Sequence, residues 1–149
     1  MKVRKASKED ALSLINLYTQ LLPNDSFNIV GITDFIENVA KSNDYFVLVL
    51  EDSNKIVATC TLIIIKNMTH KCRPFGVIEN VVTDLEFRRH GFGKIILDEA
   101  IKIAINNRCH KVMVQTRQKH NYIFDFYSKC GFSSQLSKGF MINLEEKNE

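Results

Sequence analysis

Two spacings of hydrophobic residues divide the chain. In its first 41 residues, apolar positions recur every three or four residues, as on the buried side of an amphipathic helix. This pattern predicts helices over about 7–21 and about 33–41, after a short strand that opens at Val3. Ser7 is a favoured N-cap residue and Asp10 places an acid three positions later, which marks the start of the first helix.

The pattern then changes to long β-branched and aromatic runs. "YFVLVL" (45–50) and "KIVATCTLIII" (55–65) predict a hairpin of two long strands, and "GVIENVVT" (76–83) predicts a third strand. The intervening stretch, 67–75, is polar and basic and predicts a loop.

After residue 90 helices and strands alternate. The sequence predicts a long helix over 91–107, a strand over 111–116, a helix over 120–130 ended by Gly131, and a last strand over 139–144. This order predicts a mixed α/β fold, in which meandering strands precede the long helix and crossover units follow it. At 149 residues, the length predicts a single domain over 1–149.

Composition and charge exclude several classes of function. The net charge of +3 is too small and too scattered to predict a nucleic-acid partner, and no apolar run is long enough to predict a membrane span. The N-terminal residues lack the pattern of a signal peptide, and none of the four cysteines is in a C-x-x-C pair. We therefore expect free thiols and a cytoplasmic protein. The four histidines are too widely spaced for a helical zinc pair, so no metal is expected.

The segment "FRRHGFGK" (87–94) suggests an anion site. Two glycines at the start of a helix let the backbone N–H groups close on a ligand, and the helix dipole favours a phosphate there. The segment matches neither a P-loop nor a dinucleotide-binding fingerprint, because the required further glycines are missing. The alternative interpretation is a glycine-containing turn with solvated arginines.

Three signals in order resemble the GCN5-related N-acetyltransferase (GNAT) superfamily. Arg88, Gly91 and Gly93 meet its motif Q/R-x-x-G-x-G/A, which follows the strand "GVIENVVT". Some 35 residues later, "FYSKCGF" (126–132) is similar to the Phe-Tyr-x-x-x-Gly-Phe signature of its late helix. The resemblance implies the GNAT fold, with a mostly antiparallel sheet, one splayed parallel pair of strands and flanking helices.

The same resemblance implies acetyl-CoA as the acetyl donor. Its pyrophosphate would lie on the N–H groups at the helix mouth, and its pantetheine arm would pair with the backbone of the third long strand like an added half-strand. A backbone N–H at that strand's bulge would polarise the thioester carbonyl. The implied cofactor-binding residues are Val81, Val82, Thr83, Arg88, Arg89, His90, Gly91, Phe92, Gly93, Lys94, His120 and Asn121.

Amide formation from a thioester needs a base for the amine and an acid for the leaving thiolate. Glu79, which interrupts the apolar pattern of "VIENVV", is the candidate base; alternatively it pairs with a lysine or only positions the substrate ammonium. Tyr127 is the candidate acid, because a phenol with an ordinary pKa near ~10 keeps its proton at neutral pH. The alternative is that Tyr127 is a core aromatic residue.

The acceptor is less well defined. The resemblance places it between the two N-terminal helices, the loop 67–75 and the segment 116–121. Both loops are basic, which would suit a phosphorylated or carboxylated amine or simply form a solvated face; the residues are Lys66, His70, Lys71, Arg73, Arg117, Lys119 and His120.

"CHKVMV" (109–114) and "VIENVV" (77–82) are also similar to stretches of glucosamine-phosphate N-acetyltransferases, which usually have an acid at the position of Asn80. We expect an N-acetyltransferase acting on a small-molecule primary amine. The alternatives are a protein lysine or N-terminal acetyltransferase, and a non-catalytic CoA-binding regulatory module. Homodimers are common in this family, so the oligomeric state stays open.

Overall fold

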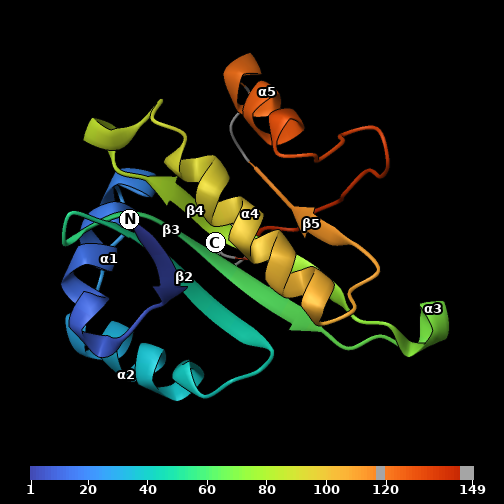
Figure 1. Cartoon of the computed structure of the whole chain (residues 1–149), viewed down its shortest axis with the longest axis horizontal. Coiled ribbons are helices and arrows are strands. Elements are labelled where there is room, and N and C mark those ends of the chain that lie inside the picture. Colours follow the sequence, from blue (N-terminus) through green and yellow to red (C-terminus); the bar gives the residue numbers. More distant parts are fainter. Residues whose placement is uncertain (117–119, 145–149) are drawn as a thin grey trace. The chain divides into compact units, whose positions relative to one another are not determined.

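A computed structural model describes residues 1–116 and 120–144 of the chain. The chain forms two compact units, Met1–Arg117 and Gln118–Glu149. Figure 1 shows the whole chain with its helices and strands labelled.

The first unit contains a five-stranded sheet whose spatial order β1-β2-β3-β4-β5 is also the order along the chain. The first four strands form an antiparallel meander, and β5 is parallel to β4. This confirms the predicted mixed sheet with one parallel pair. The strands are β1 Lys2–Lys5, β2 Tyr45–Asp52, β3 Lys55–Ile65, β4 Phe75–Thr83 and β5 Val112–Val114.

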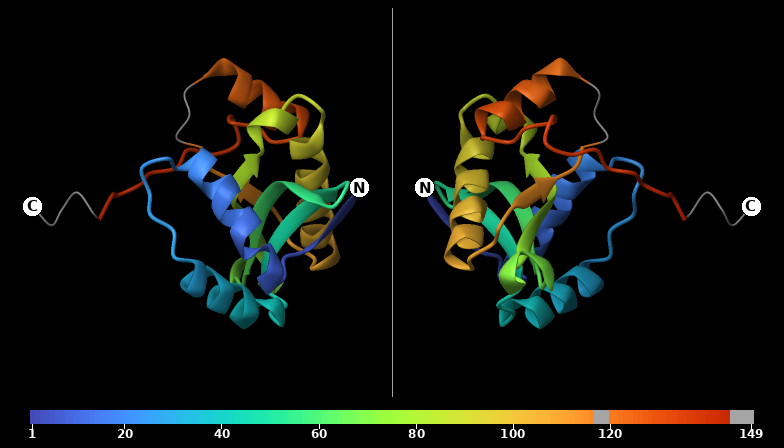
Figure 2. Two further views of the ribbon diagram at one scale, coloured as in Figure 1. Left: turned by 90° about the vertical axis from the view of Figure 1, so that its left-hand side faces the viewer. Right: turned by 90° about the vertical axis from the view of Figure 1, so that its right-hand side faces the viewer.

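Helices cover both faces of this sheet (Figure 2). Helices α1 (Ala11–Leu21) and α2 (Ile29–Ala40) pack on one face, and α4 (Phe92–Asn106) packs on the other. Side chains alternate between the two faces along each strand: Val47 and Val49 join the core cluster beneath α1 and α2, and Leu48 lies between them. Short 3-10 turns, η1 (Lys8–Asp10) and η2 (Leu85–Phe87), lead into α1 and α4.

The β2–β3 hairpin turns through two residues, Ser53 and Asn54, both with positive φ (48° and 63°). Two consecutive left-handed residues match the right-handed twist of the flanking strands, so this tight turn sets the first pairs of the hairpin; between Leu50 and Glu51 the register then shifts by one residue. The predicted hairpin is confirmed.

Helix α2 begins four residues earlier than the sequence predicts. The side chain of Asn28 accepts hydrogen bonds from the backbone N–H groups of Val30 and Gly31, at 2.9 and 3.3 Å. This cap satisfies two of the unpaired donors at the helix start, which allows β-branched residues and a glycine to occupy the first turn.

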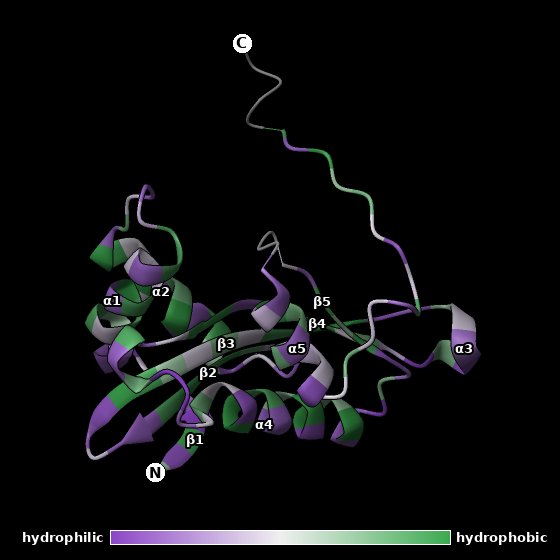
Figure 3. Cartoon of the chain, turned by 90° about the horizontal axis from the view of Figure 1, so that it is seen from above, coloured by the Kyte–Doolittle hydropathy of each residue, from purple (hydrophilic) through white to green (hydrophobic). Residues whose placement is uncertain are grey.

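The loop predicted over 67–75 contains a short helical turn, α3 (Thr69–Cys72). Its residues His70, Lys71 and Cys72 have left-handed backbones, with φ of 54°, 59° and 58°. In Figures 1 and 3 this turn lies at the end of the sheet opposite α1 and α2.

The second unit contains α5 (Asn121–Lys129), close to its predicted span. Gly131 follows with φ of 89°, and the N–H of Phe132 donates to the carbonyl of Tyr127 at 3.0 Å, so the predicted left-handed glycine cap is confirmed. The strand predicted over 139–144 is wrong, because these residues have no strand conformation. A hydrophobic run becomes a strand only when a neighbouring edge supplies hydrogen bonds, and no described strand pairs with it.

Candidate acetyl-transfer site

Strand β4 changes character in its middle. From Gly76 to Ile78 it pairs with β3 on one side and β5 on the other, but from Glu79 to Thr83 no described residue of β5 pairs with it. The two parallel strands therefore separate after three residue pairs, as the resemblance implied. Among the described residues no strand pairs with this edge in the second half of β4, so an extended ligand can add there like a strand.

The same point carries a β-bulge. Thr61 lies opposite Glu79 and Thr59 lies opposite Val82, so the two residues Asn80 and Val81 face the single residue Cys60. Asn80 takes up the extra length with a left-handed backbone, φ 52°, which asparagine tolerates better than most side chains. A bulge bends the strand and turns backbone groups out of the ladder, which makes it suited to contact a bound carbonyl.

Glu79 projects from the face that α1 and α2 cover. Val47, Thr61 and Glu79 lie directly opposite one another across β2, β3 and β4, and opposed residues share a face of the sheet. Its side chain is exposed and has no hydrogen bond or ion pair with the described residues. Burial, and then the negative charge of Glu79, raise the pKa of the nearby Tyr45. The lysine partner considered for Glu79 is thus not found among the described residues.

The segment 87–94 forms the start of α4, as predicted. Gly91 is the N-cap residue and has φ of 83°, a left-handed conformation that glycine adopts without steric cost. The carbonyl of Gly91 accepts hydrogen bonds from the N–H groups of Lys94 and Ile95, at 3.0 and 3.1 Å. Among the described residues none accepts from the N–H groups of Phe92 and Gly93, so two donors at the positive end of the helix dipole are available.

Several side chains at the start of α4 make contacts within the protein. The Arg88 guanidinium donates from Nε to the carbonyl of Thr83 at 3.2 Å, which ties the mouth to the end of β4. Lys94 Nζ contacts both carboxylate oxygens of Asp98 at 2.7 Å. Nδ1 of His90 lies 2.9 Å from the carbonyl of Arg88, and the His90 ring stacks on Phe92. Arg89 is exposed, with φ of 65°.

Three further predicted donor-binding residues lie on β4 itself. Val82 is buried in the core cluster, at 4% exposure, so only its backbone can meet a ligand. Val81 and Thr83 are half-buried on the part of the strand that β5 does not pair with. The structure thus brings Glu79, residues 81–83 and residues 88–94 together in one unit.

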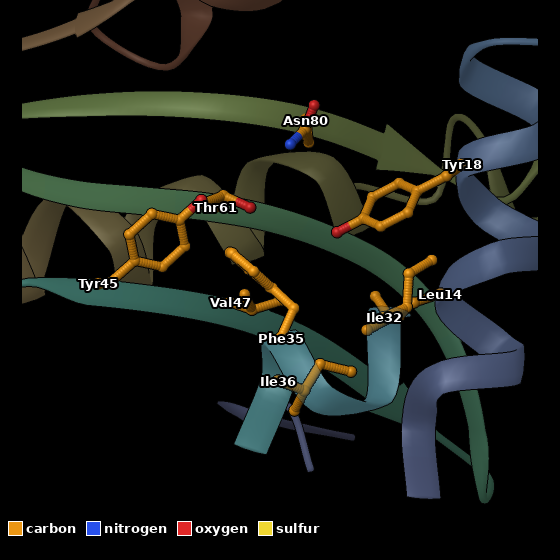
Figure 4. A pocket seen from close by; sticks show the side chains of 9 residues that line it. All are labelled: Leu14, Tyr18, Ile32, Phe35, Ile36, Tyr45, Val47, Thr61 and Asn80. Atoms are coloured by element: carbon orange, nitrogen blue, oxygen red, sulfur yellow. The ribbon is translucent and has the colours of Figure 1, made fainter. Parts of the chain in front are cut away.

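A pocket of about 150 Å³ opens under α1 and α2 (Figure 4). Figure 4 shows the Asn80 amide above it, the Tyr18 ring entering from α1, and Phe35 and Ile36 entering from α2. Sequence reasoning missed this pocket, although an asparagine inside a β-branched run was the available signal for the bulge at its edge. Its lining residues are Leu14, Tyr18, Ile32, Phe35, Ile36, Tyr45, Val47, Thr61 and Asn80.

Tyr127, His120 and Asn121 belong to the second unit. His120 is the N-cap residue of α5 and Asn121 is its first residue. Tyr127 is half-buried, and its ring makes edge contacts with Phe126 and Phe132, with centroids 5.1 and 5.9 Å away. These contacts fix the ring and are compatible with both interpretations of Tyr127.

The basic loop does not border the pocket. Asn80 follows Phe75, where the loop ends, by five positions along β4, which corresponds to about 17 Å of strand. Arg73 is also engaged locally, because its guanidinium donates to the carbonyls of Arg108 and Cys109 at 3.2 and 3.1 Å. Residues 67–75 thus do not line this pocket, and the expected acceptor site between this loop and the N-terminal helices stays a prediction. Arg117 and Lys119, also expected there, lie outside the described residues.

The cysteines offer no evident nucleophile. All four are free, and burial raises the pKa of the Cys60 thiol to about 12. Across residues 1–116 and 120–144 no group of three or more His, Cys, Asp or Glu side chains is arranged to hold a metal ion. Within the same ranges no helix has the length and apolar character needed to cross a membrane.

An open strand edge, a bulge and a glycine-capped helix mouth together define a site suited to a long, phosphate-bearing acyl donor. Comparison with protein families agrees, since residues 11–132 match the model of the Acetyltransferase (GNAT) family. The chain belongs to this family, whose members use acetyl-CoA as cosubstrate. The resemblance, the fold class, the acyltransferase class and the cosubstrate expected from the sequence are confirmed.

Named relatives narrow the comparison. The chain is 32% identical over 111 residues to glucosamine 6-phosphate N-acetyltransferase from Arabidopsis thaliana, covering 71% of this chain and 72% of that protein. It is 28% identical over 135 residues to a probable glucosamine 6-phosphate N-acetyltransferase from Drosophila melanogaster, covering 89% of this chain but only 60% of that protein.

A solved structure of a putative acetyltransferase from Agrobacterium tumefaciens is also similar. It superposes with a TM-score of 0.87 at 34% identity, covering 96% of this chain and 99% of that one. The similarity to glucosamine-phosphate N-acetyltransferases expected from two short stretches is thus found at moderate identity along most of the chain.

Proposed function

We propose that this protein transfers the acetyl group of acetyl-CoA to a primary amine of a small molecule. The observation that carries the proposal is the continuity of β4 with the mouth of α4. The open edge of residues 79–83 leads to the unpaired N–H groups of Phe92 and Gly93, and Arg88 joins the two parts through Thr83. Family membership supplies the donor.

In this proposal acetyl-CoA lies along the edge of residues 79–83 of β4 and the start of α4. The pyrophosphate accepts hydrogen bonds from backbone N–H groups between Arg89 and Lys94, aided by the helix dipole. The pantetheine arm pairs with the backbone of Val81, Val82 and Thr83. The thioester carbonyl then reaches the bulge, where a backbone N–H near Val81 stabilises the negative charge that develops on its oxygen. His120 and Asn121 are proposed as further contacts, on the basis of the resemblance alone.

The chemistry requires protons to leave the amine nitrogen and one proton to reach the departing thiolate. Glu79, directly or through one water, takes a proton from the substrate ammonium, and the neutral nitrogen attacks the thioester carbon. The new C–N bond forms, the C–S bond breaks, and Tyr127 gives its proton to the leaving thiolate. The nitrogen loses its second surplus proton as the amide forms, and this proton passes through water to the Tyr127 phenolate, which restores the acid. The role of Tyr127 rests on its motif and on the ordinary pKa of a phenol, near ~10, because a group still protonated at neutral pH can donate.

The relatives suggest one specific acceptor. Their names state that they acetylate glucosamine 6-phosphate, which carries a primary amine. The matched region spans only 60% of the Drosophila protein, so its acceptor does not by itself define the acceptor of this chain. Glucosamine 6-phosphate is accordingly one of the amines to be compared.

The first test is calorimetric titration with acetyl-CoA of the wild type and of Gly91→Ala. A Cβ at Gly91 meets nothing within 4 Å, but φ is 83°, so alanine must strain or change the helix mouth. That strain is about 1–2 kcal/mol, and we expect roughly tenfold weaker binding. Gly31→Ala is the matched control: its Cβ meets only ordinary contacts at 3.9 Å, so its affinity for acetyl-CoA should equal that of the wild type.

Release of free CoA in the presence of amines then tests transfer itself. Donor binding that is about tenfold weaker in Gly91→Ala, together with CoA release that depends on an added amine, supports the proposal. Equal binding by both glycine variants contradicts the assignment of the helix mouth. Donor binding without CoA release for any small amine contradicts the proposed reaction and favours the protein-acetylating or regulatory alternatives.

A further inference from the structure

The pocket under α1 and α2 has the position and the chemistry to select the acceptor. It is lined by Asn80 of the bulge, and Glu79, the proposed base, lies on the same face of the sheet next to Thr61. An amine held by the pocket would thus have its nitrogen close to the carboxylate that must remove its proton. The following inference rests on the proposed function.

No charged side chain is among the described residues that line the pocket. Its walls are aliphatic and aromatic side chains, and its polar groups are neutral: the hydroxyls of Tyr18, Tyr45 and Thr61, and the amide of Asn80. Burial raises the pKa of Tyr18, and the Thr59 and Thr61 side chains only partly offset this effect. An environment that disfavours a phenolate also disfavours a buried phosphate or carboxylate without a counter-ion.

Aromatic rings define the mouth of the pocket. Phe35 and Tyr45 meet edge to face, with centroids 5.5 Å apart, and Phe35 is 45% exposed at this rim. The Tyr18 ring faces them from α1 (Figure 4). Such a rim suits an apolar body, and the aromatic faces also attract an ammonium held at Glu79.

Size limits the body further. A pocket of about 150 Å³ is comparable in volume with cavities that bind a single benzene-sized ring. A phosphorylated hexosamine is larger and carries two negative charges that these walls do not neutralise.

We propose that the pocket bounded by Tyr18, Phe35, Tyr45 and Asn80 binds the small, uncharged apolar body of the acceptor, a single aromatic ring or short alkyl chain, while Glu79 holds its primary ammonium. The substrate class is therefore a compact aryl- or alkylamine. Recognition comes from burial of the apolar body and from one carboxylate, and a phosphate group on the acceptor is not required.

The test compares two amines and one pair of variants. We measure kcat/KM of the full chain for 2-phenylethylamine and for glucosamine 6-phosphate, with acetyl-CoA as donor. Ile32→Phe narrows the pocket, whereas Val30→Phe adds the same ring on the 63% exposed side of α2 and serves as the matched control. We expect kcat/KM for 2-phenylethylamine to exceed that for glucosamine 6-phosphate at least tenfold. It should fall at least tenfold in Ile32→Phe and stay unchanged in Val30→Phe.

A second variant guards against misfolding of the first. Phe35→Ala removes a half-exposed ring, so it should fold, and it should raise KM for 2-phenylethylamine more than for butylamine. Higher kcat/KM with glucosamine 6-phosphate than with 2-phenylethylamine, or equal effects of Ile32→Phe and Val30→Phe, would overturn the proposal. Absence of transfer to every amine, with donor binding retained, would instead contradict the proposed function.

Discussion

The two halves of β4 show how one strand can serve both the core and the site. In its first half, residues 76–78 pair on both sides, and Ile78 is completely buried. In its second half, residues 79–83 have strand partners among the described residues only on the β3 side, and the exposed Glu79 and Asn80 interrupt the apolar pattern. The bulge separates the halves. One half of a strand can therefore pack in the core while the other half offers backbone groups and a carboxylate to a ligand, provided that pairing with one neighbouring strand ends between the two halves.

The largest expected effect is a loss of stability when a cavity is created in the first half of β4. Ile78→Ala should lower the free energy of unfolding by about 3 kcal/mol, because Ile78 is fully buried and the vacated space cannot be refilled. Val81→Ala, at a half-buried position in the second half, should cost clearly less. Urea unfolding followed by circular dichroism measures both; equal losses would show that the two halves do not differ in packing.

Removing a charge in the second half of β4 should have the opposite effect to Ile78→Ala: catalysis should fall while stability does not change. Glu79→Gln keeps the size of an exposed side chain, so stability and acetyl-CoA affinity should not change. Loss of a general base should lower kcat about 100-fold at neutral pH. Steady-state kinetics at several pH values separate the two roles considered for Glu79: a base affects kcat and its pH dependence, whereas a positioning group mainly affects KM. Unchanged kcat/KM would exclude both.

The bulge itself should be sensitive to backbone preference. Asn80→Ala places an ordinary residue at φ 52° and should cost about 1 kcal/mol of stability, whereas Asn80→Gly should be nearly neutral. The measurement is thermal unfolding of both variants. If alanine is tolerated as well as glycine, the left-handed conformation at residue 80 is not a constraint on the fold.

The smallest effect is electrostatic and local. Because the negative charge of Glu79 is one cause of the raised pKa of Tyr45, Glu79→Gln should lower that pKa toward its ordinary value without removing the part due to burial. Titration of ¹³C-labelled tyrosines by NMR, with Tyr45→Phe to assign the signal, measures the change. A pKa that stays the same would place the carboxylate farther from Tyr45 than the structure does.

The elements that the sequence predicted are those whose signal is local. The turn residues Ser53 and Asn54 lie between two β-branched runs, and Gly91 stands directly before an amphipathic segment, so both the hairpin and the helix mouth could be read from neighbouring residues. The start of α2 was missed because Ile29, Val30 and Gly31 are poor helix formers. Their helical state depends on the cap by Asn28, whose side-chain hydrogen bonds outweigh the propensities.

What could not be predicted depends on distant partners. The segment 139–144 has the composition of a strand, but pairing with an edge is not encoded in its own residues. The bulge at Asn80 was expected only through the family resemblance, since it is defined by its register with Thr59 and Thr61. The pocket joins side chains from α1, α2 and three strands, from Leu14 to Asn80, and no spacing along the chain reveals such a set.

The order of the strands has a consequence for biosynthesis. Since every strand pairs with the one made immediately before it, the growing chain can extend the sheet one strand at a time. The outer edge of β4 stays unpaired while the roughly 30 residues between Thr83 and Val112 are made, which takes roughly two to six seconds at ordinary ribosomal speed; only β1 waits longer, because β2 begins about 40 residues after Lys5. When β5 arrives it covers only three residues of that edge. The part of β4 proposed to receive the donor is therefore a section of the nascent sheet that pairing with β5 never closes.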